Sequence, residues 1–165
     1  MVFIIRDAMK KISWKAYLAW ILVCEAVGVL SGFLSREGMM LYEATAIKPA
    51  LTPPGWVFPI VWSLLYALMG ISTARISASE EPGRERALNL FAAQLIVNFF
   101  WPLLFFNAMA FGFAFLWLVL LWILVLLMIL AFYRIEPLSA WLQVPYLLWL
   151  TFAAYLNLMV WLLNR

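Results

Sequence analysis

The feature that most constrains this chain is a series of five apolar segments, each long enough to cross a lipid bilayer as a helix. They occupy residues 16–34, 56–77, 87–106, 111–132 and 140–163. A helix needs about 20 apolar residues to cross a hydrocarbon core of about 30 Å. A helix also satisfies its backbone amides internally, and these runs lack the alternation of barrel strands. The sequence therefore predicts an all-α fold, a polytopic integral membrane protein whose residues 1–165 form one bundle of five transmembrane helices.

The composition excludes several classes of protein and site. Hydrophobic residues make up 68% of the chain and charged residues 12%, which is too few charges to cover a soluble domain. The absence of histidine excludes His-ligated zinc, a haem with a proximal histidine and a Ser-His-Asp triad. The single cysteine, Cys24, excludes an internal disulfide and a cysteine-cluster metal site. With no histidine and one cysteine, we expect no metal site. The net charge of +3 forms no basic stripe, so we expect no nucleic-acid partner.

The distribution of cations predicts the orientation in the membrane. Of the eleven Lys and Arg residues, only Arg36, Lys48 and Arg165 lie on the face opposite the N-terminus. Because cations in short loops stay on the cytoplasmic side, we expect a cytoplasmic N-terminus. The first apolar segment lacks the small-residue cleavage site of a signal peptide and is expected to be retained. The longest predicted connection, residues 35–55, lies on the external face and is a candidate functional loop.

Polar and aromatic side chains recur at helical spacing on three of the predicted spans, which predicts a common interior. The inward sets are Pro59, Trp62, Ser63, Tyr66, Gly70 and Thr73 on the second span, Gln94, Asn98, Trp101 and Phe105 on the third, and Gln143, Tyr146, Trp149, Ala153 and Asn157 on the fifth. Amides that converge within an apolar, aromatic lining favour a small-molecule pocket over an ion path. The fourth span has no polar side chain beyond its indoles and is predicted to be the most lipid-exposed.

Two features allow a structural and a functional interpretation. Glu25 is the only acid at membrane depth, and is either a proton or cation site or a hydrogen-bonded packing residue beside Gly28 and Gly32. The packing interpretation is favoured, because the sequence shows no partner cation nearby. Six of the ten indoles are assigned to positions outside the pocket. Four are predicted to lie at the membrane interface, namely Trp14, Trp20, Trp141 and Trp161, and two are predicted to face lipid, namely Trp117 and Trp122. The pocket candidates that remain are Trp56, Trp62, Trp101 and Trp149.

Three stretches of the chain have a familiar form. Residues 48–62 read Lys-Pro-Ala-Leu-Thr-Pro-Pro-Gly-Trp-Val-Phe-Pro-Ile-Val-Trp. The pattern continues in register through residues 94–106 and 145–157. In these motifs, and from the first span onwards, the chain resembles the tryptophan-rich sensory protein and translocator protein family, once called the peripheral benzodiazepine receptor. The resemblance implies a compact five-helix bundle, often a homodimer, that binds porphyrins and synthetic aromatic ligands in a pocket near the first loop.

The resemblance also implies roles for particular residues. Trp62 and Trp149 would flank the ligand, Asn98 would place an amide near it, and Ala153 a small residue against it. Some bacterial relatives degrade protoporphyrin in light and oxygen, which makes the two indoles the catalytic candidates if this chain is an enzyme. With the inward-facing residues, the full set of candidate ligand-binding residues is Pro54, Trp56, Pro59, Trp62, Tyr66, Gln94, Asn98, Trp101, Tyr146, Trp149 and Ala153.

Together these features lead to one hypothesis and two alternatives. The hypothesis is a receptor or sensor, of the bacterial type and in the cell membrane, that binds porphyrin-type tetrapyrroles. It requires no cofactor, takes protoporphyrin as its ligand, and leaves open whether the porphyrin is degraded in light. One alternative is a transporter of tetrapyrroles or other amphipathic molecules. The other is a regulatory scaffold for a second membrane protein, which would use glycine-lined helix contacts.

Overall fold

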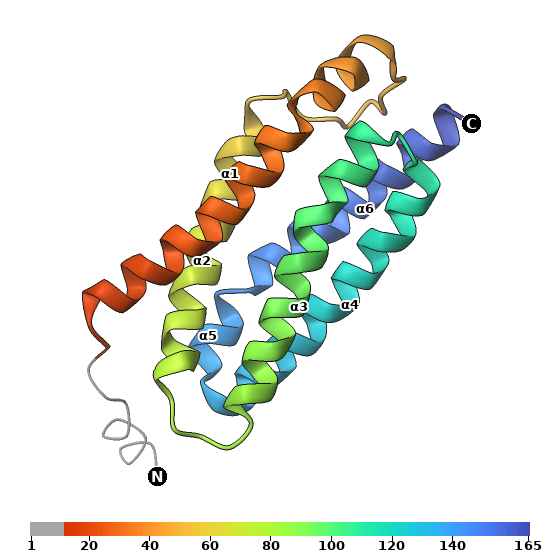
Figure 1. The fold of residues 1–165 in the computed structure, drawn as a ribbon. Coiled ribbons are helices and arrows are strands. Elements are labelled where there is room, and N and C mark those ends of the chain that lie inside the picture. The colour runs from red at the N-terminus through yellow and green to blue at the C-terminus, as the bar shows by residue number, and fades with distance from the viewer. Residues whose placement is uncertain (1–11) are drawn as a thin grey trace.

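A computed structural model describes residues 12–165, and every long element in that range is a helix (Figure 1). The elements in chain order are α1 (Trp14–Thr45), α2 (Val57–Ala78), α3 (Arg84–Pro102), the π-helix η1 (Leu103–Asn107), α4 (Phe111–Ile135), α5 (Pro137–Trp141) and α6 (Val144–Leu163). When η1 is counted as the end of α3 and α5 as the start of α6, five helices are long and apolar enough to cross a membrane. This confirms the predicted all-α, multi-pass membrane bundle.

The helices form two groups that lie side by side along the bundle. α1 packs along α2, and α4 packs against α3, α5 and α6. In the view of Figure 1, the connection from α1 to α2 and the end of α6 lie at the upper end. The start of α1, the turn from α2 to α3 and the junction of α4 with α5 lie at the lower end. The two ends of the bundle therefore differ in which loops they carry.

The first helix is longer than expected. α1 continues to Thr45, through eleven residues that were predicted to belong to the loop 35–55. The extension contains no proline, and it packs inward at Gly38, where an added Cβ would collide with Phe106 and Asn107. Asn107 also donates its side-chain N–H to the Leu34 carbonyl at 2.9 Å. Packing against η1 therefore keeps this segment helical, and only residues 46–56 connect α1 to α2.

The fifth span is interrupted, whereas one continuous helix over residues 140–163 was predicted. α5 ends at Trp141, and α6 begins at Val144 after a turn. Pro145 lies in the first turn of α6, where its missing N–H costs nothing. In a continuous helix, residue 145 would have to donate a backbone N–H to the carbonyl of Trp141, and proline has no N–H to donate. The proline therefore explains why the helix restarts here.

The prediction that the fourth span is the most lipid-exposed is wrong. α4 buries residues at helical spacing against its neighbours, and α1 is the least buried span, with 17% of its apolar window buried against 28% for α4. The indoles of α4 also bond across helices. Trp117 donates its N–H to the Val97 carbonyl at 2.8 Å, and Trp122 donates to the Thr151 hydroxyl at 2.9 Å. Large apolar side chains suit a protein neighbour as well as lipid, so hydropathy alone does not distinguish the two surroundings.

A pair of hydrogen bonds joins the first connection to the end of α6 at the upper end of the bundle. The backbone N–H of Ile47 donates to Oδ1 of Asn164 at 2.8 Å. The side-chain N–H of Asn164 donates in return to the Ile47 carbonyl at 2.9 Å. This reciprocal contact, called the Asn164 clasp below, fixes the start of the first connection to the last turn of the chain's final helix.

Candidate ligand site

Four of the predicted site residues form one hydrogen-bonded chain in the interior. Tyr66 comes from α2, Gln94 and Asn98 from α3, and Tyr146 from α6, and all four are buried. The Tyr66 hydroxyl donates to Oδ1 of Asn98 at 3.5 Å. Nδ2 of Asn98 donates to the Tyr146 hydroxyl at 2.8 Å. The Tyr146 hydroxyl then donates to Oε1 of Gln94 at 2.9 Å. These four residues, called the polar chain below, join three helices.

Aromatic rings pack against one another between α2 and α6, beside the polar chain. The Trp62 ring lies 5.6 Å from that of Tyr66 and 6.1 Å from that of Tyr146, between centroids. Nearer the upper end, the Trp149 ring lies 5.8 Å from that of Phe58, again across α2 and α6. Both indoles are half-buried. The two candidate catalytic tryptophans therefore lie on facing helices in one aromatic wall, with the polar chain buried beside Trp62.

The remaining predicted site residues are more dispersed. Trp101 donates its N–H to Oδ1 of Asn157 at 3.2 Å and stacks on Phe105 at 5.1 Å, so its polar atom is already used in the bundle. Ala153 packs against the main core cluster. Pro54 and Trp56, predicted for the rim, are exposed, and Trp56 retains 68% of its accessible surface. Pro59 was predicted to face the interior, but in the first turn of α2 it is exposed, so that prediction is wrong.

Glu25 has a hydrogen-bonding partner on the neighbouring helix. The Ser63 hydroxyl lies 3.1 Å and 3.2 Å from the two carboxylate oxygens of Glu25. The two glycines beyond Glu25 have different surroundings: a Cβ on Gly28 would collide with the Tyr66 ring, whereas Gly32 has no atom within 4 Å of such a Cβ. Gly28 is therefore a packing position within this chain, and it touches a member of the polar chain.

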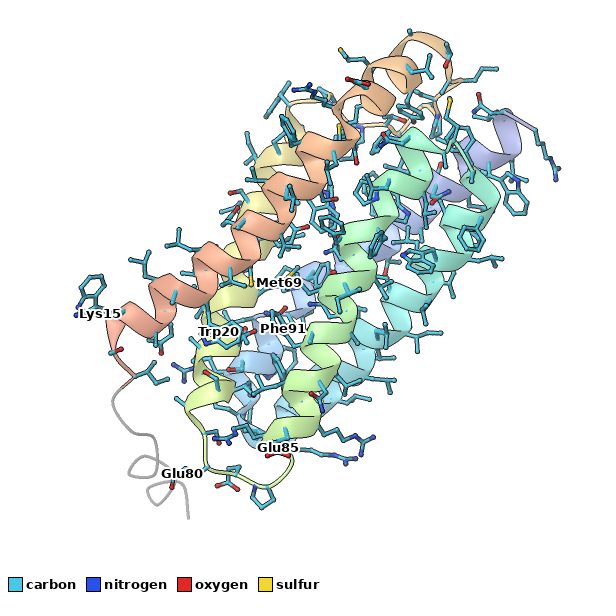
Figure 2. The ribbon with its side chains drawn as sticks, viewed as in Figure 1. Lys15, Trp20, Met69, Glu80, Glu85 and Phe91 are labelled. Atoms are coloured by element: carbon cyan, nitrogen blue, oxygen red, sulfur yellow. The ribbon has the colours of Figure 1, made fainter. Side chains whose placement is uncertain are left out.

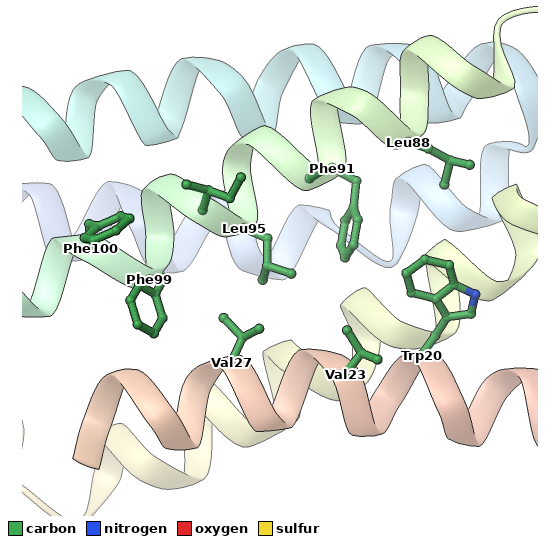
Figure 3. A pocket seen from close by; sticks show the side chains of 10 residues that line it. Trp20, Val23, Val27, Leu88, Phe91, Leu95, Phe99 and Phe100 are labelled. Carbon is green, nitrogen blue, oxygen red and sulfur yellow. The ribbon is translucent and has the colours of Figure 1, made fainter. Parts of the chain in front are cut away.

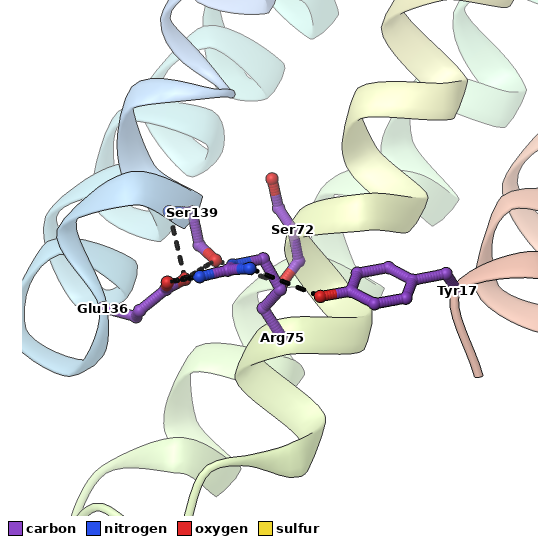
Figure 4. Close-up of polar contacts among 5 residues, drawn as sticks. All are labelled: Tyr17, Ser72, Arg75, Glu136 and Ser139. Carbon is purple, nitrogen blue, oxygen red and sulfur yellow. Dashed lines mark hydrogen bonds and ion pairs between the residues drawn. The ribbon is translucent and has the colours of Figure 1, made fainter. Parts of the chain in front are cut away.

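Sequence reasoning missed an ion-paired cluster at the lower end, shown in Figure 4. The Arg75 guanidinium, at the end of α2, donates from Nε to both carboxylate oxygens of Glu136 at 2.9 Å, and Nη2 pairs with the same carboxylate. Arg75 also donates to the Tyr17 hydroxyl of α1 at 3.3 Å. The Ser139 hydroxyl donates to Glu136 and lies 3.4 Å from the Ser72 carbonyl. These residues, called the lower cluster below, connect α1, α2 and α5.

The surroundings of Glu136 favour its charged form. Burial alone raises the pKa of the Glu136 carboxyl, but the hydrogen bonds from Arg75 and Ser139 and the positive charge of Arg75 outweigh burial and hold that pKa below its usual value. The sequence contained one signal for this site. Glu136, Pro137 and Ser139 have the spacing of a helix start, in which an acidic N-cap precedes a proline, and the Glu136 side chain does accept the Ser139 backbone N–H at 3.2 Å.

Gln143 connects the lower cluster to α6. Its side-chain Nε2 donates to the Ser72 hydroxyl at 2.7 Å and the Leu68 carbonyl at 3.1 Å. Gln143 is buried at the break between α5 and α6, one turn before Tyr146. It was predicted to face the interior but was not among the candidate ligand-binding residues. The contacts show that it anchors the start of α6 to α2.

A separate apolar groove lies between α1 and α3, shown in Figure 3. Its volume is about 350 Å³, and its lining includes Trp20, Val23, Phe91 and Leu95. The Trp20 and Phe91 rings meet edge to face at 6.1 Å, and Figure 2 shows them facing each other from the two helices. Trp20, assigned to the interface from the sequence, therefore packs between helices. The lining residues include none of the predicted site residues.

The interior of the bundle presents groups that could contact an aromatic ligand. Among residues 12–165, His, Cys, Asp and Glu form no group of three that could hold a metal. The interior instead presents indole and phenol rings, two amides and two hydroxyl groups. Rings of this kind stack on a flat π-system, and the amides and hydroxyls exchange hydrogen bonds with a ligand's polar groups.

Comparison with known proteins identifies the family. The sequence profile of the TspO/MBR family matches residues 20–162. The tryptophan-rich protein TspO of Chlorobaculum tepidum is 36% identical over 144 residues, which cover 86% of this chain and 91% of that protein. The translocator protein of Sus scrofa is 38% identical over 143 residues, covering 82% and 85%. The tryptophan-rich sensory protein of Cereibacter sphaeroides is 32% identical over 151 residues, covering 92% of each. The profile match and these relatives confirm the resemblance seen in the motifs, and the chain belongs to the TspO/MBR family.

Proposed function

We propose that this protein is a membrane sensor that binds a porphyrin-type tetrapyrrole between α2, α3 and α6. A tetrapyrrole is a flat, apolar π-system that carries a few polar arms. Indole and phenol faces stack on such a ring, and amides or hydroxyls bond the polar groups. Two relatives are named a translocator protein and a tryptophan-rich sensory protein, and both names are consistent with a membrane protein that responds to a ligand.

One observation carries the proposal: the Trp62 ring packs on two phenol rings whose hydroxyl groups are joined through Asn98. An apolar wall and a polar chain are thus adjacent, on three helices that converge. Buried polar groups are costly unless paired, and in this group of two amides and two hydroxyls the side-chain Nε2 of Gln94 has no partner. A flat ligand with polar arms uses both parts of this site.

The upper end of the bundle offers cations for the ligand's carboxylates. Lys48 pairs with Glu43, so its charge is already compensated. Arg36 is 61% exposed and lies 4.0 Å from Glu37, a weak surface pair. Arg36 is therefore the more available partner for a carboxylate that reaches the membrane surface.

The test is a protoporphyrin titration of the purified protein in detergent, in the dark and under illumination. We expect saturable quenching of tryptophan fluorescence, because a bound porphyrin would lie against Trp62 and Trp149. If the indoles also carry photochemistry, illumination in oxygen removes the porphyrin spectrum, and the Trp62→Phe, Trp149→Phe double variant abolishes that loss. Trp141→Phe is the matched control, because this indole is exposed on α5. A folded wild type without saturable quenching would overturn the proposal.

The alternatives give different results in the same system. Protein-dependent uptake of porphyrin into vesicles, if it survives the double tryptophan variant, would assign transport rather than sensing. Co-purification with one membrane protein, insensitive to added porphyrin, would assign a scaffold.

We also propose that the lower end of the bundle faces the cytoplasm. Within residues 12–165 it carries Lys15, Arg75, Arg84, Arg86 and Arg134, whereas the upper end carries Arg36, Lys48 and Arg165. The natural cysteine, Cys24, is fully buried, so single introduced cysteines can report sidedness. An impermeant maleimide should label Thr52→Cys and not Ser79→Cys in intact cells, and the reverse pattern would invert the orientation.

A further inference from the structure

The polar chain has a direction. Each of its three hydrogen bonds runs the same way: Tyr66 donates to Asn98, Asn98 to Tyr146, and Tyr146 to Gln94. Groups that donate and accept in sequence polarise one another, so the last donor in such a series is strengthened. That last donor is the side-chain N–H of Gln94.

The donor at the end of the chain has no partner. Nε2 of Gln94 is buried and makes no hydrogen bond, although Gln94 has no exposed surface. An unpaired buried donor destabilises the folded protein, so the site is stabilised by any molecule that supplies an acceptor. The other three members of the chain each have a partner for their side-chain donor.

We propose that Gln94 Nε2 is a hydrogen-bond donor subsite, which donates to a carbonyl or carboxyl oxygen on an arm of the bound ligand. The inference rests on the proposed function and narrows its ligand class to flat aromatic molecules with an oxygen-bearing flexible arm. Gln94 accepts from the Tyr146 hydroxyl and has no exposed surface, and the Trp62 ring meets the Tyr146 ring edge to face at 6.1 Å. A flexible arm is narrower than the macrocycle, so we expect the arm, and not the macrocycle, to be the part of the ligand that reaches Gln94.

The direction of the chain decides between an acceptor and a donor on the ligand. If the side-chain amides of Gln94 and Asn98 were flipped and the two tyrosine hydroxyls rotated, every hydrogen bond of the polar chain would run the opposite way. Gln94 would then offer a carbonyl oxygen and would select a donor on the ligand. In the arrangement described, it offers N–H and selects an acceptor. A pair of ligands that differ in this one property separates the two arrangements.

The probes are mesoporphyrin dimethyl ester and etioporphyrin, two uncharged porphyrins. The first carries ester carbonyls on flexible arms, and the second carries only alkyl groups. We expect the wild-type protein in detergent to bind the ester about three- to tenfold more tightly, the range set by one neutral hydrogen bond. Infrared difference spectra should also show the ester carbonyl stretch moving to lower wavenumber on binding, a readout that needs no variant.

Variants assign the preference to Gln94. Gln94→Met keeps the length of the side chain and removes its donor, so the affinity ratio between ester and etioporphyrin should fall to about one. The matched control is Gln143→Met, which alters the other buried glutamine, whose unpaired atom is the acceptor Oε1. The control should keep the ester preference. Size-exclusion profiles and circular dichroism establish that each variant is folded.

The outcomes separate the inference from the proposed function. If neither porphyrin binds the wild type, the proposed function fails. If both bind equally, or the ester carbonyl stretch does not shift, the donor subsite is wrong and the proposed function stands. An ester preference that survives Gln94→Met, or a preference for etioporphyrin, also overturns the subsite.

Discussion

The two ends of the interior join α2 to the fifth span in different ways. At the lower end, α2 contacts α5 through the ion pair and hydroxyl contacts of the lower cluster, whose Arg75 and Glu136 side chains are only 18% and 14% exposed. Further up, α2 meets α6 through rings, between Trp62 and Tyr146 and between Phe58 and Trp149. Removing one partner of a buried ion pair lowers the stability of the fold strongly, because a charge is left unpaired. Two rings that separate lose only their van der Waals contact energy. The lower end can therefore hold the helices together if the upper end opens for the proposed ligand.

Removing Arg75 should give the largest loss of stability. Arg75→Met leaves the Glu136 carboxylate without its cation, and we expect a loss of about 2 to 3 kcal/mol, reduced from the fully buried case by partial exposure. Thermal unfolding in detergent, followed by circular dichroism, measures it. Porphyrin affinity of the folded fraction should stay within about twofold, since the lower cluster does not touch the aromatic wall.

A second variant sharpens the test of the ion pair. The double variant Arg75→Met, Glu136→Leu removes both charges, and it should recover most of the lost stability because no unpaired charge is left. The exposed Arg86→Met variant should unfold like the wild type. A single Arg75→Met variant as stable as wild type would mean that the lower cluster does not hold the bundle.

Two glycines of α1 should respond differently to the same substitution. Gly28→Ala places a methyl group in the Tyr66 ring, which must shift, at a cost of about 2 kcal/mol. Gly32→Ala meets nothing within 4 Å and should gain up to about 1 kcal/mol from helix propensity. Thermal unfolding of both variants checks this, and equal midpoints would show that Tyr66 is not held against α1.

Removing one hydroxyl from the polar chain should cost less. Tyr146→Phe takes away the acceptor of Asn98 and the donor to Gln94, and we expect a loss of about 1 kcal/mol after local rearrangement. Tyr155→Phe, at an exposed tyrosine of α6, is the control and should be neutral. Unfolding by denaturant in mixed micelles measures both. A neutral Tyr146→Phe would indicate that the polar chain contributes no stability in the absence of ligand.

The smallest predicted effect is on the acid side of the pH–stability profile. The pKa of Glu136 is lowered in the folded protein from the usual 4.5, so its contribution is complete above that pH and is lost as the pH falls through the folded value. Unfolding midpoints should therefore drop more steeply below pH 4.5 in the wild type than in Glu136→Gln. Parallel profiles would assign the acid sensitivity to other carboxylates.

Most of the fold was predictable because bilayer thickness fixes how long an apolar helix must be. The spans ending near Ser77 and beginning near Phe111 match α2 and α4 closely. The extension of α1 was not predictable, since it depends on Gly38 packing against η1, a contact between segments far apart in sequence. The lipid exposure of α4 was also misjudged, because hydropathy measures transfer from water and does not distinguish lipid from protein.

The candidate site was predictable to the extent that helical periodicity sets which side chains share a face. Periodicity placed Tyr66, Asn98 and Tyr146 in one interior, and the structure joins their polar atoms. Periodicity does not predict which side chains bond across helices. The direction of the polar chain and the unpaired Gln94 donor are therefore seen only in the structure. The lower cluster was missed because Glu136 lies 61 residues from Arg75, and periodicity within one helix does not predict a pairing at that separation.

The Asn164 clasp couples the first connection to the end of α6. Ile47 lies at the start of the connection that leads to the exposed Trp56, and the clasp ties it to the final turn of α6. A rearrangement of that connection therefore either carries the end of α6 with it or breaks two hydrogen bonds. A fluorophore attached at the end of α6 would therefore report, at a distance, a rearrangement of the first connection.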